Sequence, residues 1–322
     1  MKLQQIGERE IIRRIFVTSG MTQEIDDCAT LPHGNSYSLY TTDVIRRSTH
    51  IPEGAGPDLI GKFAVNINLS DIAAMGGIPD GFLFSLLIPP ESEIDYLEEL
   101  ASSISRALRP FNCELLGGDT KEGSELVIAG TAIGHQLKSK TMKRSRLRKG
   151  QIVGHLNSLG RGGAGYLSYK MGFNREMGIK MMLDVNARIK EAQIIGEHGG
   201  QFMMDLSDGL FSSIHQMKRD YGIGFKIVED ELRFHPQVMK LSKVSGLHPL
   251  DIIDYGGDYE LFFSIDNSHY RDFMDAMEGE KIDVHFIGEA WDGENMIFDG
   301  QQWTKIKRKG WEHFTGMFNA DP

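Results

Sequence analysis

Eight aspartates lie in short segments that carry few other charges and have glycine or serine close by. An aspartate that only solvates the surface usually sits among lysines and glutamates. One that ends an apolar strand or helix beside glycine more often serves a ligand or a turn. The eight are therefore the first candidates for a functional site: Asp26, Asp27, Asp43, Asp71, Asp119, Asp205, Asp208 and Asp258.

Asp71 is the most informative of them. The sequence predicts a helix over residues 57–76, and the spacing of Ile60, Ala64, Ile67 and Met75 places Asp71 on its apolar face. A carboxylate there has to be paired, hydrogen-bonded or bound to a metal, because burying it bare costs several kcal/mol. We favour a metal or polar ligand over an internal salt bridge or a cap.

Asp43 and Asp119 each have a simpler alternative. Asp43 ends an alternating strand predicted over residues 35–45, where it could serve a turn. Asp119 follows two glycines, which allow a ligand or another backbone to come close, but a tight turn with a side-chain hydrogen bond is equally compatible.

Asp205 and Asp208 frame the segment DLSDG, which opens a helix predicted near residues 208–220. Either Asp205 or Ser207 could cap this helix, and Asp208 would be favourable in its first turn. Asp26 and Asp27 are adjacent and would point to opposite sides of an extended chain, so we expect one of them to face a shared site.

Converging carboxylates repel one another. Two unit charges about 4 Å apart cost roughly 4 kcal/mol at an effective dielectric constant near 20. A hard cation would hold them ionised together, and an Asp-rich set without His–Cys spacing points to Mg²⁺ or Mn²⁺ rather than zinc. Such an ion usually serves phosphates.

Composition excludes several classes of protein. The 35 basic and 45 acidic residues give a net charge of −10, which argues against a general nucleic-acid or membrane-surface binder. Two cysteines, Cys28 and Cys113, suit a reducing cytoplasm. The N-terminus has no apolar signal region, and the longest strongly apolar stretch, residues 82–88, is too short to span a bilayer.

The pattern of strands and helices restarts after a basic run. Seven of the twelve residues from 138 to 149 are basic, and helices alternate with strands on both sides of this run. We therefore predict two α+β domains, residues 1–145 and 146–322. The basic run could be a solvated linker, or Arg144 and Arg148 could reach a nucleotide's phosphates.

The chain has no P-loop motif, but it has a formal G-x-G-x-x-G at Gly160, Gly162 and Gly165. A dinucleotide site is one interpretation. We favour close helix packing, or backbone N–H groups that face an anion, because no doubly wound pattern surrounds the motif.

Together the motifs resemble those of the thiamine-monophosphate kinase family, in the aminoimidazole-ribonucleotide-synthetase-like superfamily. The match runs from about residue 8 to 314. Nine segments follow the family order: IDDCATLPHG, TTDVIRRSTHI, FAVNINLSDIAAMGGIP, LLGGDTKEGSELVIAGTAIGH, KRSRLRKGQIV, LGRGGAGYL, MMDLSDGLFSSI, GGDYELFFS and GWEHF.

The resemblance implies a fold and a reaction. The fold would be α+β, with an N-terminal sheet domain that forms a homodimer and a C-terminal α/β sandwich. ATP would lie between the domains, with Mg²⁺ bridging its phosphates, and its γ-phosphoryl group would pass in line to thiamine phosphate. The attacking phosphate oxygen is already anionic, so we assign no catalytic base.

The resemblance also implies roles for individual residues. Asp208 and Arg144 would be catalytic. Mg²⁺ would be held by Asp27, Asp43, Asp71, Asp119, Asp205 and Asp208. The nucleotide would contact Thr41, Thr42, Gly118, Asp119, Thr120, Arg144 and Ser207. The acceptor would contact His50, Asp258 and Trp311.

The chain departs from the family pattern at three places. Ile25 replaces a glycine, Gly257 replaces a glutamate, and the substrate loop before His50 is Arg-Arg-Ser-Thr at residues 46–49. Two alternatives therefore stay open: a divergent relative that uses ATP on another small substrate, and a non-catalytic nucleotide-binding homologue.

Overall fold

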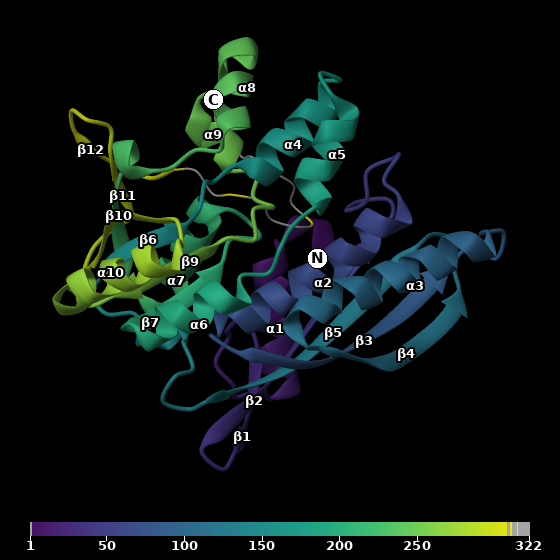
Figure 1. The fold of residues 1–322 in the computed structure, drawn as a ribbon. Coiled ribbons are helices and arrows are strands. Elements are labelled where there is room, and N and C mark those ends of the chain that lie inside the picture. Colours follow the sequence, from purple (N-terminus) through teal and green to yellow (C-terminus); the bar gives the residue numbers. More distant parts are fainter. Residues whose placement is uncertain (1, 308–309, 311–313, 315–322) are drawn as a thin grey trace.

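Two β-sheets with helices packed against them build the molecule (Figure 1). The structure is a computed structural model, and it describes residues 2–307, 310 and 314. The connection between the sheets runs from residue 138 to 151 and contains a short 3₁₀ helix, η3 (Arg144–Arg146). The boundary predicted at residue 145 falls in this connection, and we keep it as a proposed division.

The N-terminal sheet has five strands in the order β1-β2-β5-β3-β4. All neighbours are antiparallel except β3 and β4, which are parallel. Helices α2 and α3 lie along one face of the sheet (Figure 1). The elements of this half are α1 (Glu8–Ser19), β1 (Ala29–His33), β2 (Ser36–Arg46), α2 (Pro57–Ala74), β3 (Ile78–Ile88), α3 (Ile94–Leu108), β4 (Glu114–Glu122) and β5 (Val127–Leu137).

The C-terminal sheet has seven strands in the order β12-β11-β8-β10-β6-β9-β7. Its strands are β6 (Ile152–Leu156), β7 (Gly200–Asp205), β8 (Gly224–Val228), β9 (Leu261–Ile265), β10 (Val284–Trp291), β11 (Met296–Phe298) and β12 (Trp303–Lys305). Its helices are α4 (Arg161–Lys170), α5 (Arg175–Leu183), α6 (Ile189–Glu197), α7 (Leu210–Tyr221), α8 (Pro236–Ser245), α9 (Pro249–Ile253) and α10 (Tyr270–Glu280).

Both faces of this second sheet are covered. Phe262 and Phe263 are adjacent on β9 and fully buried, yet they belong to two different hydrophobic clusters. Phe263 packs with Phe273 of α10, and Phe262 shares its cluster with Phe211 of α7. Because successive strand residues point to opposite faces, the sheet lies between two helical layers, which is the expected α/β sandwich.

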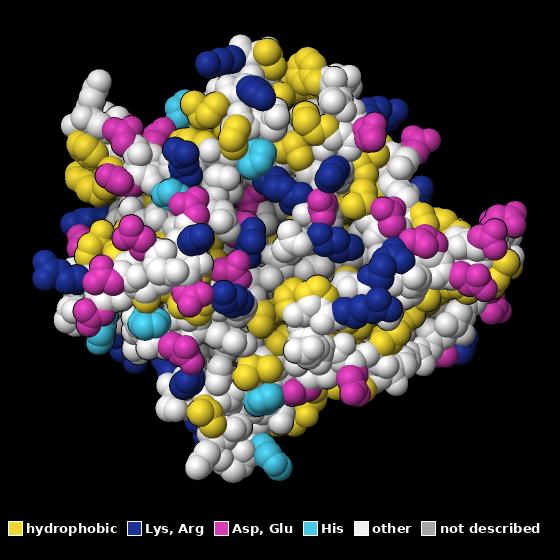
Figure 2. Space-filling model, viewed as in Figure 1, with side chains coloured by type: hydrophobic (Ala, Val, Ile, Leu, Met, Phe, Trp, Pro, Cys, Tyr) yellow, Lys and Arg dark blue, Asp and Glu magenta, His cyan; other side chains and the backbone are white. Residues whose placement is uncertain are grey.

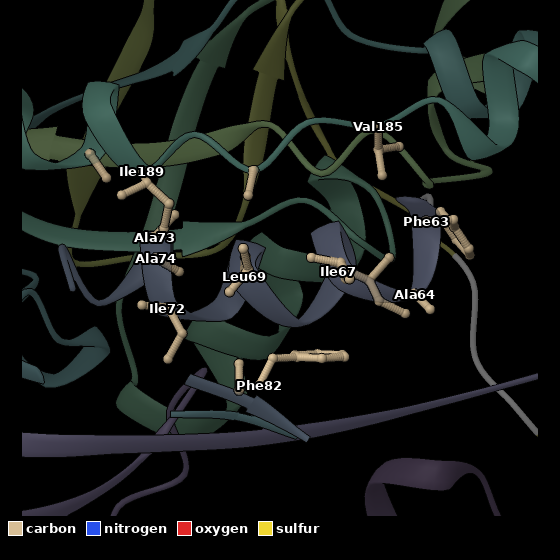
Figure 3. Packing of buried hydrophobic residues seen from close by; sticks show 14 of the residues in the cluster. Phe63, Ala64, Ile67, Leu69, Ile72, Ala73, Ala74, Phe82, Val185 and Ile189 are labelled. Atoms are coloured by element: carbon tan, nitrogen blue, oxygen red, sulfur yellow. The ribbon is translucent and has the colours of Figure 1, made fainter. Parts of the chain in front are cut away.

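Helix α2 is the element that joins the two halves (Figure 3). Pro57 occupies its first turn, where a missing N–H costs nothing, and Gly76 follows its end with a φ of 66°. Ile72 points toward the side of Phe82 on β3, while the opposite side of the helix faces Val185 and Ile189 (Figure 3). The helix is therefore buried nearly all round, as expected for one packed between two layers.

The face of the N-terminal sheet away from α2 carries exposed apolar side chains. Val44 of β2 is 54% exposed, Leu87 of β3 40% and Leu116 of β4 52%. Every residue of β4 is exposed. We call this the outer sheet face. None of the described elements covers it.

Surface charge is mixed rather than segregated on the face shown in Figure 2. Dark blue Lys and Arg side chains cross the middle of this view, but magenta acidic groups lie among them. Among the described residues, no helix combines the length and the apolar character needed to cross a bilayer.

Candidate functional site

Three aspartates from separate parts of the chain meet between the two sheets. One carboxylate oxygen from each of Asp27, Asp71 and Asp205 lies within 4.8 Å of the other two. Asp27 precedes β1, Asp71 lies on α2, and Asp205 ends β7. The two halves of the chain thus contribute to one group of carboxylates, which we call the aspartate cluster.

Helix α2 positions two members of the cluster. Asp71 follows the buried Ile60, Ala64 and Ile67 on the predicted spacing. Its carboxylate accepts a hydrogen bond of 2.5 Å from the hydroxyl of Thr41 on β2. The preceding residue, Ser70, donates a hydrogen bond of 2.8 Å to Asp205. The alternative of a salt bridge at Asp71 finds no partner among the described residues.

Asp43 lies on the same side of β2 as Thr41 and faces α2. Its backbone N–H donates to the side-chain oxygen of Asn68, at 3.0 Å. Asn68 is fully buried and also donates to the carbonyl of Ala64. Asn68 was not among the predicted site residues, although it precedes Asp71 by three residues and so shares its side of the helix.

Arg144 is the cation of this region. It is 8% exposed, and its guanidinium binds Asp27 through Nη2 at 2.6 Å and Nε at 3.2 Å. Asp26 accepts the backbone N–H of Arg144 at 3.2 Å. The interpretation of the basic run as a solvated linker is therefore wrong at Arg144, because the residue neutralises buried carboxylates. Arg148, by contrast, donates to the backbone carbonyls of Ser145 and Leu147.

Four carboxyl groups of this region hold protons more tightly than aspartates in water. Burial, and then the charge of Asp27, raises the pKa of Asp205 to about 8 and that of Asp26 to about 7. Burial, and then the charges of Asp208 and Glu8, raises the pKa of Asp43 to about 6. The pKa of Asp71 lies well above its ordinary value because of burial and the neighbouring carboxylates. Arg144 offsets only part of this repulsion.

The donor set is suited to a hard divalent cation. Three oxygens already lie close together, and two more aspartates, Asp43 and Asp208, contribute charge to the same region. No histidine or cysteine belongs to the group of three. Carboxylates that supply only oxygen match the ligands of Mg²⁺ better than those of zinc.

Asp208 and Ser207 precede α7. The residue that caps this helix is Gly209, and no side chain caps it. The capping alternative for Asp205 or Ser207 is therefore wrong: Asp205 instead accepts from Ser70, and the carbonyl of Ser207 accepts the N–H of Gly257 at 2.6 Å.

Asp258 holds two backbone N–H groups of the chain in place. Its two carboxylate oxygens accept the backbone N–H groups of Gly160 and Gly162, at 2.7 and 3.0 Å. The glycine-rich turn before α4 thus donates to a carboxylate within the chain rather than to a dinucleotide. A substrate contact for Asp258 has no support in this geometry.

Several predicted residues lie away from the cluster. The strand register aligns Asp43 with Gly130, Phe84 and Gly118, whereas Asp119 aligns with Ser85 on the outer sheet face. Within one chain, Asp119 is therefore on the wrong side of the sheet to join Asp71. It is 64% exposed and pairs with Lys121 at 2.7 Å.

Three of the predicted nucleotide contacts lie on strands of the N-terminal sheet, and the register places Thr42 on the outer sheet face but Gly118 in line with Asp43. Thr42 points to the outer sheet face and donates to the carbonyl of Gly130 at 2.7 Å. Gly118 lies so close to β3 that a side chain would meet the carbonyl of Phe84. Thr120 is exposed on β4. The strand that carries Thr42 was predicted, whereas β4, which carries Gly118 and Thr120, was not.

Of the two other predicted acceptor contacts, His50 and Trp311, the structure describes only the first. His50 lies in the turn after β2, where its ring nitrogen Nδ1 accepts the backbone N–H of Arg46 at 3.2 Å. Trp311 lies outside the described residues.

Comparisons with known proteins agree with the two halves of the fold. Residues 25–136 match the family described as AIR synthase related protein, N-terminal domain, and residues 148–300 match its C-terminal domain. Thiamine-monophosphate kinase from Aquifex aeolicus is 27% identical over 98% of this chain and all of that protein. The protein of the same name from Leptospira interrogans is 30% identical over 96% of this chain and 98% of its own length.

A solved structure of AaThiL complexed with AMPPCP and TMP has a similar fold. It superimposes with a TM-score of 0.86 at 27% sequence identity, and covers 97% of this chain and 99% of that one.

Proposed function

Because the chain belongs to the thiamine-monophosphate kinase family, among the AIR synthase related proteins, we propose that it transfers the γ-phosphoryl group of ATP to thiamine phosphate. The products would be thiamine diphosphate and ADP. The observation that carries the proposal is the aspartate cluster, because its carboxylates come from both halves of the fold and are hydrogen-bonded in place.

We infer that the cofactor of the site is Mg²⁺, held by Asp27, Asp71 and Asp205 with Asp43 and Asp208 beside them. The ion would neutralise phosphate charge that the carboxylates alone would repel. Thr41 and Ser70 orient two of these carboxylates, and Asn68 fixes the backbone of Asp43.

Arg144 in this proposal holds Asp27 in position, since its guanidinium donates twice to that carboxylate. The attacking phosphate oxygen needs no base, because it is anionic near pH 7. Catalysis then consists of alignment and charge neutralisation, which is the usual pattern of phosphoryl transfer.

The direct test is ADP release with Mg²⁺ and ATP over a panel of acceptors: thiamine phosphate, thiamine and unrelated phosphate monoesters. We expect ADP in step with thiamine diphosphate, measured by chromatography, for thiamine phosphate alone. Turnover of a different acceptor only would replace the substrate assignment. Binding of ATP without turnover of any acceptor would favour the non-catalytic homologue.

We also propose that two copies pair through the outer sheet face. The exposed Val44, Leu87 and Leu116 would lose contact with water in such a dimer. Asp119 lies on the same face, so its carboxylate would lie at or beside the contact between the two copies.

A charged substitution in this face is expected to give monomers. Leu87→Glu should halve the mass measured by light scattering from twice 36.1 kDa to that of one chain, because a buried charge opposes association. The matched control is Ile94→Glu, which alters an exposed residue at the start of α3, in the helical layer on the other side of the sheet. A wild-type monomer, or dimers of Leu87→Glu, would contradict the proposed interface.

The proposed location is the cytoplasm. Both cysteines are free and buried, which suits a reducing compartment.

A further inference from the structure

Tyr259 adopts a backbone conformation that is unfavourable for a residue with a side chain. Its φ is 52°, in the left-handed region. Its backbone N–H donates to the carbonyl of Leu206 at 3.1 Å, directly beside Asp205. Strained residues persist where the surrounding structure over-determines them, and they gather at functional sites.

The two neighbours of Tyr259 supply that constraint. Asp258 accepts the N–H groups that open α4, as described above. Glu260 binds Arg188 at 2.5 Å and accepts from Asn157 at 2.8 Å. Both flanking side chains are thus anchored in the C-terminal half. The direction of the Tyr259 side chain between them is fixed before any ligand arrives.

The ring of Tyr259 reaches across to the N-terminal half. It packs edge-on against Phe63 of α2, with 5.8 Å between ring centroids and an interplanar angle of 83°. Burial, followed by the charges of Asp43, Asp205, Asp208 and Asp71, raises the pKa of the phenol well above its ordinary value. A tyrosine hydroxyl is uncharged near pH 7 whatever its surroundings, and this one lies near carboxylates from both halves.

The hydroxyl is available to a ligand. Among the described residues it has no hydrogen-bond partner, and its oxygen is not completely buried. A neutral O–H beside a cation site can approach a phosphate without adding to the negative charge there. Phe63 lies in the first half of α2, the helix that also carries Asp71, so the ring is held against the helix that contributes to the aspartate cluster.

We propose that Tyr259 donates a hydrogen bond from its hydroxyl to the phosphate group of the acceptor and so orients the attacking oxygen. The inference rests on the proposed function and adds a contact that the aspartate cluster, which supplies no donor, cannot make. It requires no covalent step.

The test is Tyr259→Phe, which keeps the ring on Phe63 and removes only the hydroxyl. We expect kcat with thiamine phosphate to fall about 100-fold, at the lower end of the loss caused by removing one donor from a preorganised site. The KM for ATP, the rate of ATP hydrolysis without acceptor and the thermal midpoint should not change. The matched control is Tyr96→Phe, because Tyr96 is a half-buried phenol of α3.

The outcomes separate this inference from the proposed function. Equal kcat values for the wild type and Tyr259→Phe would overturn the inference alone. An equal loss of acceptor-free ATP hydrolysis would also overturn it, because the hydroxyl would then serve ATP. A wild type that does not phosphorylate thiamine phosphate would overturn the proposed function, and this inference with it.

Discussion

Replacing Asp71 by asparagine is expected to lower kcat by about 1000-fold or more while leaving the protein at least as stable as the wild type. Asp71 shares the aspartate cluster with Asp27 and Asp205, so the variant removes one anionic ligand from the proposed cation site. Losses of this size follow when a preorganised electrostatic contact to the transition state is removed.

The hydrogen bond and the charges around Asp71 explain why the variant should be at least as stable as the wild type. An amide oxygen can still accept the hydroxyl of Thr41, so the fold keeps that contact. Burial and the neighbouring carboxylates raise the pKa of Asp71, which means that its ionised form is unfavourable in the metal-free protein. Asparagine removes that charge at no cost in volume.

The measurements are ADP release at saturating ATP and the thermal midpoint in EDTA. Asp292→Asn is the control, because this aspartate is 78% exposed and pairs with Lys149 on the surface. Activity within about tenfold of the wild type would mean that Asp71 is not a ligand of the proposed cation. A lower midpoint in EDTA would mean that the carboxylate supports the fold rather than a cation.

Helical periodicity made Asp71 predictable. The apolar spacing along residues 57–76 requires no knowledge of the other half of the chain, and α2 follows it closely. The same local logic found the strands that became β2, β3 and β9, because each is a short run of apolar or alternating residues.

Local sequence patterns could not predict which face of the sheet a strand residue occupies, nor the register between strands. Asp119 and Thr42 fit the family motifs, but a strand alternates its side chains, and a single step decides which face a residue occupies. The β4 strand was hidden because Gly117 and Gly118 suggested a turn. The irregular register at Leu83 adds a further shift that no sequence pattern announces.

Arg144 and Tyr259 show a second limit. The charge pattern of the basic run does not distinguish the arginine that is buried against Asp27 from its neighbours. The family resemblance singled out Arg144, but as a contact to the nucleotide and not to a carboxylate. Tyr259 was passed over as part of an apolar strand. The position of its side chain depends on a left-handed φ. It also depends on hydrogen bonds that its two neighbours accept from residues more than 50 positions away in sequence.

Without Mg²⁺, the protein is expected to lose stability as the pH rises from about 4 to 8. The folded state raises the pKa of Asp43 to about 6, of Asp26 to about 7 and of Asp205 to about 8, while the unfolded chain has ordinary aspartates near 3.9. Between these values the folded state binds more protons than the unfolded state. Stability therefore falls with rising pH and levels off once the folded-state groups have ionised.

Mg²⁺ should reverse this trend, since it binds the ionised carboxylates of the folded state. At a free concentration 100 times its dissociation constant, the ion would stabilise the fold by about 2.7 kcal/mol, or roughly 5 °C in thermal midpoint for a chain of this size. At pH 5 protons compete for the same oxygens, so the shift should nearly vanish.

Thermal scans at pH 5, 6.5 and 8, in EDTA and in Mg²⁺, give the comparison. Asp71→Asn should show a smaller Mg²⁺ shift at pH 8. Midpoints that respond to Mg²⁺ equally at all three pH values would mean that the ion binds somewhere other than these buried carboxylates.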